Sequence, residues 1–553
     1  MRNIDIFDTS LRDGAQGRGV SFSLQDKLAV VRCLDELGVR WIEAGNPGSN
    51  PKDADFFREA KKLRLEHASV CAFGATVKKG AKPGEDDRLQ TLLSAETETV
   101  VIFGKSSLFH AQEILGVSPE ENLAMIAGTV RYLRDKGRHV IYDAEHFFDA
   151  RKENAEYALA TVKAALDAGA STAVLCDTNG GTFPDDISWG VTALRALCPG
   201  TEVGEGGKAG RTGEDTVIAE IGIHAHNDAG LAVACSLAAV GAGATHVQGT
   251  LIGIGERCGN TALAALIPSL ELKLGYRCLP EGCLKKLSET ARTAAEIANM
   301  ALPEGMPYVG SAAFSHKAGM HADGILKARA SFEHVDPALV GNGREFLMSE
   351  VGGRAAIAER LRKFDETITK VSPVVEAVSQ RLKTLEAEGS QFEGADASFE
   401  LLALREMGRT VSSFRIVSYR VTSEHPPTAD IECSYAWVKV LVNGQSEIAG
   451  AEGDGPVNAL DLALRRALTS FYPELSAVRL SDYKVRVING KDATAARVRV
   501  LIESTDGTSV WTTLGVSSDI IDASRFALTD AIEYKLNVLA PFTPFAPAGN
   551  GKW

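Results

Sequence analysis

The sequence has no apolar run long enough to span a bilayer, no surplus of basic charge and no Cys-x-x-Cys pair. A membrane-spanning helix needs about 20 apolar residues, so we expect no membrane protein, and the first residues predict a strand and not a signal peptide. The formal net charge of −13 argues against nucleic-acid binding. The nine cysteines are scattered and odd in number, which favours reduced thiols and a cytoplasmic location.

What is present is the composition of a large globular protein. A chain of 553 residues with 45% hydrophobic and 24% charged residues predicts two or three domains. Its negative net charge does not exclude an anionic substrate. Such a substrate would need positive charge at its binding site, which a metal ion and an arginine would supply.

Residues 1–275 alternate short β-rich runs with amphipathic helical stretches. The expected strands span residues 4–7, 41–43, 69–73, 99–103, 140–143, 172–176, 220–224 and 245–248. Eight β-then-α units predict an α/β fold, a (β/α)₈ TIM barrel. A doubly wound open sheet is the alternative, but the Gly-x-Gly-x-x-Gly turn after its first strand is missing.

Chemically capable side chains cluster where the expected strands end. They are Arg12, Asp13, Glu43, Glu145, Thr178, His224, His226 and Asn260. Barrel active sites lie at the C-terminal ends of the strands, so the barrel and the site predictions support each other.

His224 and His226 lie two residues apart, so in a strand both rings point to the same side. Two imidazoles and one carboxylate can hold a divalent metal and leave positions open for substrate. Taken alone, each residue is nearly as well explained by a cap, a salt bridge or, for Asp13 in Arg-Asp-Gly, a turn. Asn260 could add a neutral oxygen ligand or form a turn.

The remainder of the chain differs from the barrel. Residues 276–400 are mostly helical and predict linker subdomains, and residues 204–215 predict a flexible insertion without an assigned role. Residues 401–553 predict a separate α/β domain with an internal duplication, because strands followed by a helix occur twice. No ligand set clusters there, so we expect binding or regulation.

Three motifs resemble the DRE-TIM metallolyases, a family that includes isopropylmalate, homocitrate and citramalate synthases and hydroxymethylglutaryl-CoA lyase. They are Phe-Asp-Thr-Ser-Leu-Arg-Asp-Gly at residues 7–14, His-Ala-His-Asn-Asp at 224–228 and Gly-Glu-Arg-Cys-Gly-Asn at 255–260. Segments 315–324, 453–459 and 515–524 resemble the isopropylmalate synthase group through its regulatory domain, which the lyases lack. Segments 43–53 and 142–149 look most like the citramalate-forming branch.

The resemblance implies condensation of acetyl-CoA with pyruvate to give citramalate and free CoA, a step toward isoleucine. It implies that Asp13, His224 and His226, with Asn260, hold Mn²⁺, Mg²⁺, Co²⁺ or Zn²⁺. Arg12 would stabilise negative charge on the developing enolate or alkoxide, or form a structural ion pair with Glu43.

The resemblance also implies acid/base roles for Glu145 and His321. The matching histidine in the family comes from the partner subunit, which implies a domain-swapped homodimer, although spacing alone favours a surface histidine. Thr178 would bind the keto-acid carboxylate or cap a helix. Tyr142, with Phe73 and Phe103, would line a small substrate pocket or belong to the barrel core.

Three other functions stay open at this point. The chain could be a 2-isopropylmalate or homocitrate synthase that uses a larger keto acid, because pocket size cannot be derived from sequence. It could be an acyl-CoA aldol lyase of the same superfamily, or a barrel-based sensor without catalysis. The regulatory resemblance further implies feedback by isoleucine bound to the C-terminal domain.

Overall fold

The computed structural model describes residues 2–197, 220–317, 319–347, 353–409, 412–424, 433–488 and 496–539. The predicted insertion at 204–215 lies outside these ranges. The chain divides into two compact units, Met1–Phe314 with Val335–Arg344, and Ser315–His334 with Glu345–Trp553. No helix in the described ranges has the length and apolar character that a bilayer crossing requires.

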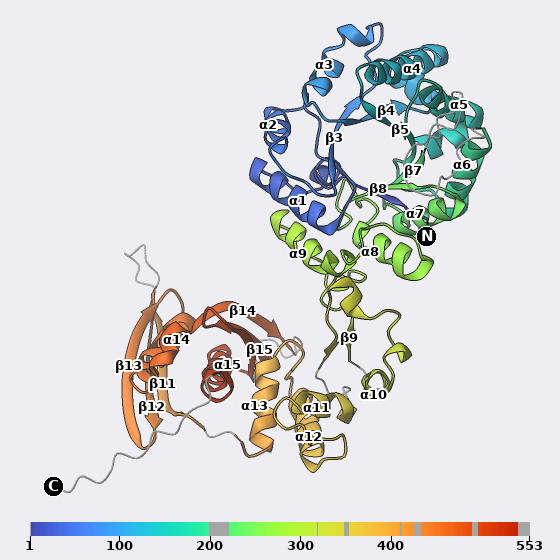
Figure 1. Ribbon diagram of the computed structural model, residues 1–553. Coiled ribbons are helices and arrows are strands. Elements are labelled where there is room, and N and C mark those ends of the chain that lie inside the picture. Colours follow the sequence, from blue (N-terminus) through green and yellow to red (C-terminus); the bar gives the residue numbers. More distant parts are fainter. Residues whose placement is uncertain are drawn as a thin grey trace, which may run out of the picture. The chain divides into compact units, whose positions relative to one another are not determined.

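The first unit is a closed barrel of eight parallel strands in sequence order (Figure 1), as predicted. The strands are β1 Asp5–Asp8, β2 Trp41–Glu43, β3 Ser69–Ala75, β4 Thr99–Lys105, β5 His139–Glu145, β6 Thr172–Asp177, β7 Glu220–Ala225 and β8 His246–Gly249. The barrel closes where β1 pairs with β8, with Asp5 opposite His246.

Helices follow the strands and ring the barrel (Figure 1). They are α1 Leu24–Leu37, α2 Pro51–Ala60, α3 Asp87–Ser94, α4 Pro119–Asp135, α5 Phe147–Asp167, α6 Pro184–Leu197, α7 Ala232–Ala242 and α8 Leu263–Pro268. Local signals set their ends: α1 begins at a capping box of Ser23 and Asp26 and stops at Gly38, whose φ of 89° suits glycine. α9 Leu287–Ile297 completes the unit.

The barrel interior is layered. Side chains alternate along each strand, so every second residue points inward. The middle layer is an apolar cluster of buried residues, Phe7, Cys71, Val101, Ile141, Val174 and Cys176. This apolar layer fills the middle of the barrel and separates the polar side chains at its two ends. A cavity at the C-terminal end therefore has an apolar floor.

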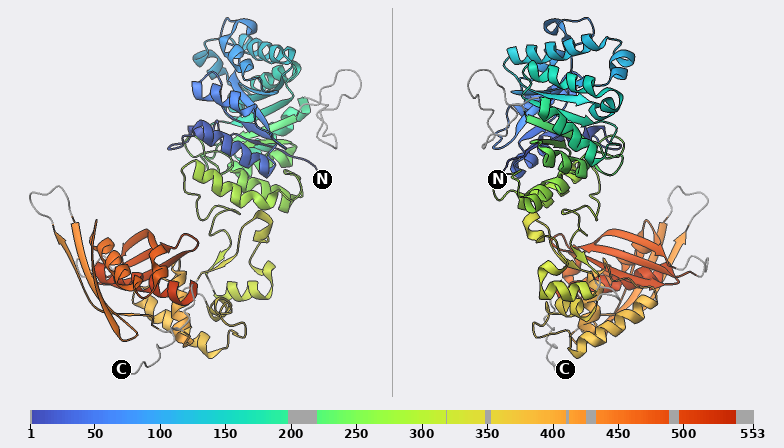
Figure 2. Two further views of the ribbon diagram at one scale, coloured as in Figure 1. Left: turned by 60° about the vertical axis from the view of Figure 1, so that its left-hand side comes forward. Right: turned by 90° about the vertical axis from the view of Figure 1, so that its right-hand side faces the viewer.

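The second unit begins with short elements and helices. They are β9 Ser315–His316, β10 Glu345–Phe346, α10 Gly319–Lys327, α11 Gly353–Leu361, α12 Pro373–Ala387 and α13 Asp396–Glu406. The rest of the unit contains two three-stranded antiparallel sheets, each followed by a helix (Figure 2), which confirms the predicted duplication.

The first sheet comprises β11 Arg415–Glu424, β12 Cys433–Val442 and β13 Gln445–Gly453, followed by α14 Pro456–Thr469. The second comprises β14 Arg479–Val487, β15 Val498–Thr505 and β16 Val510–Ser517, followed by α15 Ile520–Tyr534. Both helices contribute to one apolar core with the sheets. β13 cannot be recognised from the sequence, because small and charged residues conceal its alternation.

Candidate active site

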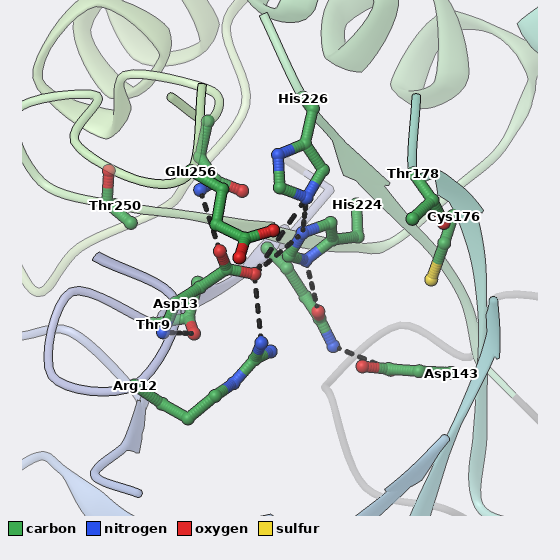
Figure 3. Close-up of polar contacts among 12 residues, drawn as sticks. Thr9, Arg12, Asp13, Asp143, Cys176, Thr178, His224, His226, Thr250 and Glu256 are labelled. Carbon is green, nitrogen blue, oxygen red and sulfur yellow. Dashed lines mark hydrogen bonds and ion pairs between the residues drawn. The ribbon is translucent and has the colours of Figure 1, made fainter. Parts of the chain in front are cut away.

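A cavity of about 240 Å³ opens at the C-terminal ends of the barrel strands. Its walls bring together Arg12, Asp13, Gln16, Phe73, Phe103, Asp143, Glu145, Cys176, Thr178, His224, His226 and Glu256. Most predicted site residues therefore meet in one place, as expected for a barrel enzyme. Figure 3 shows the polar contacts at the centre of this group.

Asp13, His224 and His226 form the centre of the site. The Nε2 atoms of the two histidines are 3.4 Å apart, and Asp13 Oδ2 lies 3.4 Å from His224 Nε2 and 3.9 Å from His226 Nε2 (Figure 3). All three side chains are buried. One donor atom from each lies within 4.8 Å of the others, an arrangement that fits a divalent cation.

A hydrogen-bonded chain behind His224 orients its ring. Gln248 Nε2 donates to Asp143 Oδ1 at 3.0 Å, which turns Gln248 Oε1 toward His224 Nδ1 at 2.8 Å. This contact favours a proton on Nδ1 of His224 and leaves Nε2 facing Asp13 at the centre of the site. Burial, with the nearby charge of Glu43, raises the pKa of Asp143 to about 7.

Arg12 links the centre to a buried carboxylate. Its Nη1 donates to Asp13 Oδ2 at 2.9 Å, and its Nε donates to Glu43 Oε2 at 2.6 Å. Thr9 Oγ1 donates to the same Glu43 oxygen at 2.5 Å. The structural ion pair considered for Arg12 from the sequence is therefore present, and the same guanidinium also faces the cavity.

The charges at the centre are strongly coupled. Burial alone would raise the pKa of Asp13, but the Arg12 charge and the two histidines outweigh it and hold that pKa well below its usual range. Burial lowers the pKa of His226 to about 4, and His224 contributes to this shift. Asp13 is thus an anion and His226 a neutral base, which are the ligand forms that a metal ion requires. Burial would lower the pKa of His224, but Asp13 outweighs it and raises that pKa, so a cation would bind His224 in competition with a proton.

Asn260 lies beside this centre. An isolated bridge pairs its backbone with His226, and its Nδ2 donates to Asp13 Oδ1 at 3.3 Å. Its Oδ1 is buried without a hydrogen-bond partner among the described residues. Gly255 leaves room for the side chain, since a Cβ there would meet Asn260 Nδ2 at 2.1 Å. The free oxygen suits the fourth ligand considered from the sequence.

Glu145 and Thr178 occupy another wall of the cavity. Glu145 forms an ion pair with Lys105, the last residue of β4. The Thr178 hydroxyl accepts a hydrogen bond from the His146 backbone N–H at 2.8 Å. With its acceptor side engaged in this way, the hydroxyl has its proton available to donate to a bound carboxylate.

The three aromatic residues considered for the pocket divide into two groups. Phe73 and Phe103 line the cavity and stack with ring centroids 5.2 Å apart, and Arg12 lies 3.9 Å above the Phe73 ring. Tyr142 is instead fully buried in the main hydrophobic core, outside the group that lines the cavity. Strand alternation explains the difference, because the neighbouring Asp143 points inward.

His321 is not among the residues that line the cavity. It belongs to the second unit, on α10, and its exposed ring stacks on Phe332 with centroids 4.2 Å apart. Within the described part of one chain, the structure does not assign this residue to the barrel site.

Several polar residues of the site were not expected from the sequence, among them Lys105, Asp143 and Gln248. Period-two alternation could have revealed Asp143 and Gln248. Asp143 lies two residues before Glu145 on β5, and Gln248 lies near the C-terminal end of β8 at a position that points into the barrel. What the sequence alone could not provide is their pairing across strands.

The comparisons with known proteins agree with this architecture. The family model described as HMGL-like matches residues 3–293, which places the barrel in that class of catalytic domains. The homocitrate synthase post-HMGL domain-like model matches residues 308–390, and the LeuA allosteric (dimerisation) domain model matches residues 393–536.

Relatives that match nearly the whole chain identify the family more closely. The chain is 47% identical to an (R)-citramalate synthase of Aquifex aeolicus, over 96% of this chain and 97% of the relative. It is 46% identical to one of Synechocystis, over 97% and 96%. A 2-isopropylmalate synthase of Pyrococcus furiosus is 30% identical, over 96% and 99%. The chain belongs to the (R)-citramalate synthase family and is an enzyme.

Replacing Gln248 tests the orientation of the His224 ring. In Gln248→Leu the Nδ1 proton loses its acceptor, so we expect metal affinity to fall about 10–100-fold. Half-maximal activity would then require a correspondingly higher Mn²⁺ concentration, which a metal titration of initial rates measures.

The matched control is Gln380→Leu, on the exposed face of α12. We expect its metal dependence to equal that of the unmodified enzyme. An unchanged Mn²⁺ requirement in Gln248→Leu would show that this glutamine does not orient a ligand.

Proposed function

We propose that the enzyme condenses acetyl-CoA with pyruvate to form (R)-citramalate and free CoA. The observation that carries the proposal is the convergence of Asp13, His224 and His226 beside Arg12, in a chain of the (R)-citramalate synthase family. The small cavity above the apolar barrel layer suits a short 2-keto acid.

Asp13, His224 and His226 would hold one divalent cation, with Asn260 Oδ1 as a further oxygen donor. A bound cation of this kind acts as a Lewis acid on the ketone of a 2-keto acid. The mixed nitrogen and oxygen donors suit Mn²⁺, Mg²⁺, Co²⁺ or Zn²⁺ and do not select one of them.

Arg12 would stabilise the negative charge that develops during carbon–carbon bond formation. Contacts with Glu43, Asp13 and the Phe73 ring fix its guanidinium, so little reorganisation is needed when that charge appears. The neighbouring carboxylates outweigh the effect of burial and raise the pKa of Arg12, so it stays protonated throughout.

Glu145 and Thr178 would act on the two substrates. We assign the acid/base role at the acetyl methyl to Glu145, and its pairing with Lys105 holds the carboxylate at the cavity wall. We assign the keto-acid carboxylate to Thr178, whose hydroxyl proton is available. The stacked rings of Phe73 and Phe103 would limit the length of the keto-acid side chain.

A comparison of three keto acids tests the reaction. With acetyl-CoA held saturating, we expect kcat/KM for pyruvate to exceed that for 2-oxoisovalerate and 2-oxoglutarate by at least about 10-fold, since one methylene is worth about 1–3 kcal/mol in a pocket. A thiol-reactive dye follows the release of free CoA.

Two outcomes would count against the proposal. A preference for either larger acid would assign the enzyme to isopropylmalate or homocitrate synthesis. Cleavage of a hydroxyacyl-CoA to acetyl-CoA, without dye reaction, would instead indicate a lyase.

We further propose that His321 of one subunit completes the site of its partner in a domain-swapped homodimer. The exposed ring on α10, in a unit separate from the barrel, supports this assignment. The match of residues 393–536 to a LeuA allosteric (dimerisation) domain supports dimer formation.

Mixed dimers test the exchange. His321→Ala and Asp13→Asn each remove one part of the composite site, so both homodimers are expected to be nearly inactive. When the two are unfolded and refolded together, half of the dimers are mixed, and each mixed dimer contains one site with both native residues. About a quarter of the unmodified activity is therefore expected, and mixtures as inactive as the parents would reject the exchange.

The three segments expected from the sequence would have separate roles. We propose catalysis by the barrel of residues 1–275, connection through residues 276–400 and feedback by isoleucine on residues 401–553. The duplicated sheets and helices with one shared core would provide the effector domain. Binding would shift the enzyme between two states, with the segment that carries His321 as the connection.

Isoleucine is expected to lower the activity of the full chain, and leucine and valine at equal concentration to do so less. Deletion of the residues from about 400 onward is expected to abolish the response, because the effector domain is removed. Initial rates with and without each amino acid provide the measurement, and size-exclusion chromatography reports the oligomeric state. Equal inhibition of the truncated enzyme would contradict the assignment.

A further inference from the structure

The opposite, N-terminal end of the barrel carries a second group of ionisable side chains. Asp5 on β1 and His246 on β8 are direct neighbours in the strand register, and Glu220 begins the adjacent β7. The group lies at the seam where the first and last strands close the barrel. The apolar middle layer separates it from the catalytic cavity.

These three residues can offer ligands to one ion. A carboxylate oxygen from Asp5, one from Glu220 and a ring nitrogen from His246 all lie within 4.8 Å of one another. Asp5 and His246 are buried, and Glu220 is half-buried. The set resembles the catalytic centre in donor type, with one imidazole and two carboxylates in place of two imidazoles and one carboxylate.

The unpaired ring nitrogens of His246 indicate a ligand. Its side chain is 0% exposed, and neither ring nitrogen has a hydrogen-bond partner among the described residues. A buried polar atom without a hydrogen-bond partner is destabilising, and in native proteins such an atom has a protein group, a water or an ion as its partner. The Phe7 ring lies 5.3 Å from the imidazole by centroids and covers part of it with apolar surface.

The backbone is shaped to admit this ring. At Gly222, a Cβ would meet His246 Cδ2 and Val174 Cγ2, each at 2.9 Å. A side chain on β7 at this point would therefore force the imidazole out of its place. Glycine leaves the space that the imidazole occupies, next to the two carboxylates.

The charges of the group are incompletely balanced. Burial raises the pKa of Glu220 to about 7, with Asp5 adding to the shift, and burial lowers the pKa of His246 to about 3. The imidazole is therefore neutral at pH 7 and has a lone pair for a metal. Arg40 Nη1 contacts the two oxygens of Asp5 at 2.5 and 2.7 Å. The charge of Arg40 and a hydrogen bond with Thr172 also act on Glu220, so a single cation faces two carboxylates.

We propose that Asp5, Glu220 and His246 form a second divalent-cation site that fastens the closure of the barrel. An ion here would bridge β7, β8 and β1 and so join the two ends of the barrel sequence. In barrels of this type the N-terminal face serves stability, whereas the C-terminal face carries catalysis. Mixed imidazole and carboxylate donors suit Mn²⁺ or Zn²⁺.

Counting Mn²⁺ ions on the full-length protein tests the site. Mn²⁺ is the probe because it binds thiols poorly, and the electron paramagnetic resonance signal of the free ion gives the bound number. We expect two ions per chain. In His224→Ala/His226→Ala, which removes two donors of the catalytic centre, we expect one, and the added Mn²⁺ should still raise Tm.

Glu220→Gln then separates the two sites. The amide keeps the size of the side chain but removes its charge, so we expect loss of one bound ion per chain, a lower Tm in Mn²⁺ and unchanged kcat. The matched control is Glu98→Gln, an exposed carboxylate directly before β4, which should keep both ions.

The count in the histidine double variant decides the matter even if Glu220→Gln fails to fold. No bound Mn²⁺ in that variant would overturn the proposal and indicate that water or a protonated Glu220 satisfies His246. Two retained ions in a folded Glu220→Gln protein would overturn it as well.

Discussion

The structure depends most on one buried anion, the carboxylate of Asp13. Burial disfavours this charge, and it persists because Arg12 on one side and His224 and His226 on the other surround it. Arg12 is in turn held by Glu43, and His224 by Gln248 and Asp143. Under the proposed function, the imidazoles and Asp13 would offer ligands to a cation, and Arg12 would offer positive charge to a reacting anion.

The barrel makes this arrangement possible because parallel strands deliver residues from distant parts of the sequence to one rim. An apolar layer below the rim excludes water from the barrel centre and strengthens every electrostatic contact above it. At the other end, the polar layer around Asp5 and His246 also brings carboxylates and an imidazole together, at the pairing of the first and last strands.

Much of this could be predicted from the sequence, because β-runs and helices alternate with clear periods. All eight barrel strands were expected, and Asp13, His224 and His226 stood at the ends of two of them. The prediction that Tyr142 lines the pocket was wrong. Tyr142 faces the helices, and its neighbour Asp143 faces the cavity. The contacts of Gln248 with His224 and of Lys105 with Glu145 join different strands, so only the folded register reveals them.

The most direct test of the central claim is anomalous diffraction from crystals of the full-length enzyme grown with Mn²⁺ and pyruvate. We expect a manganese peak at coordination distance from Asp13, His224 and His226, with the keto acid bound beside Arg12. A chain in which Asp13 contacts only Arg12, while the manganese lies away from both imidazoles, would contradict it.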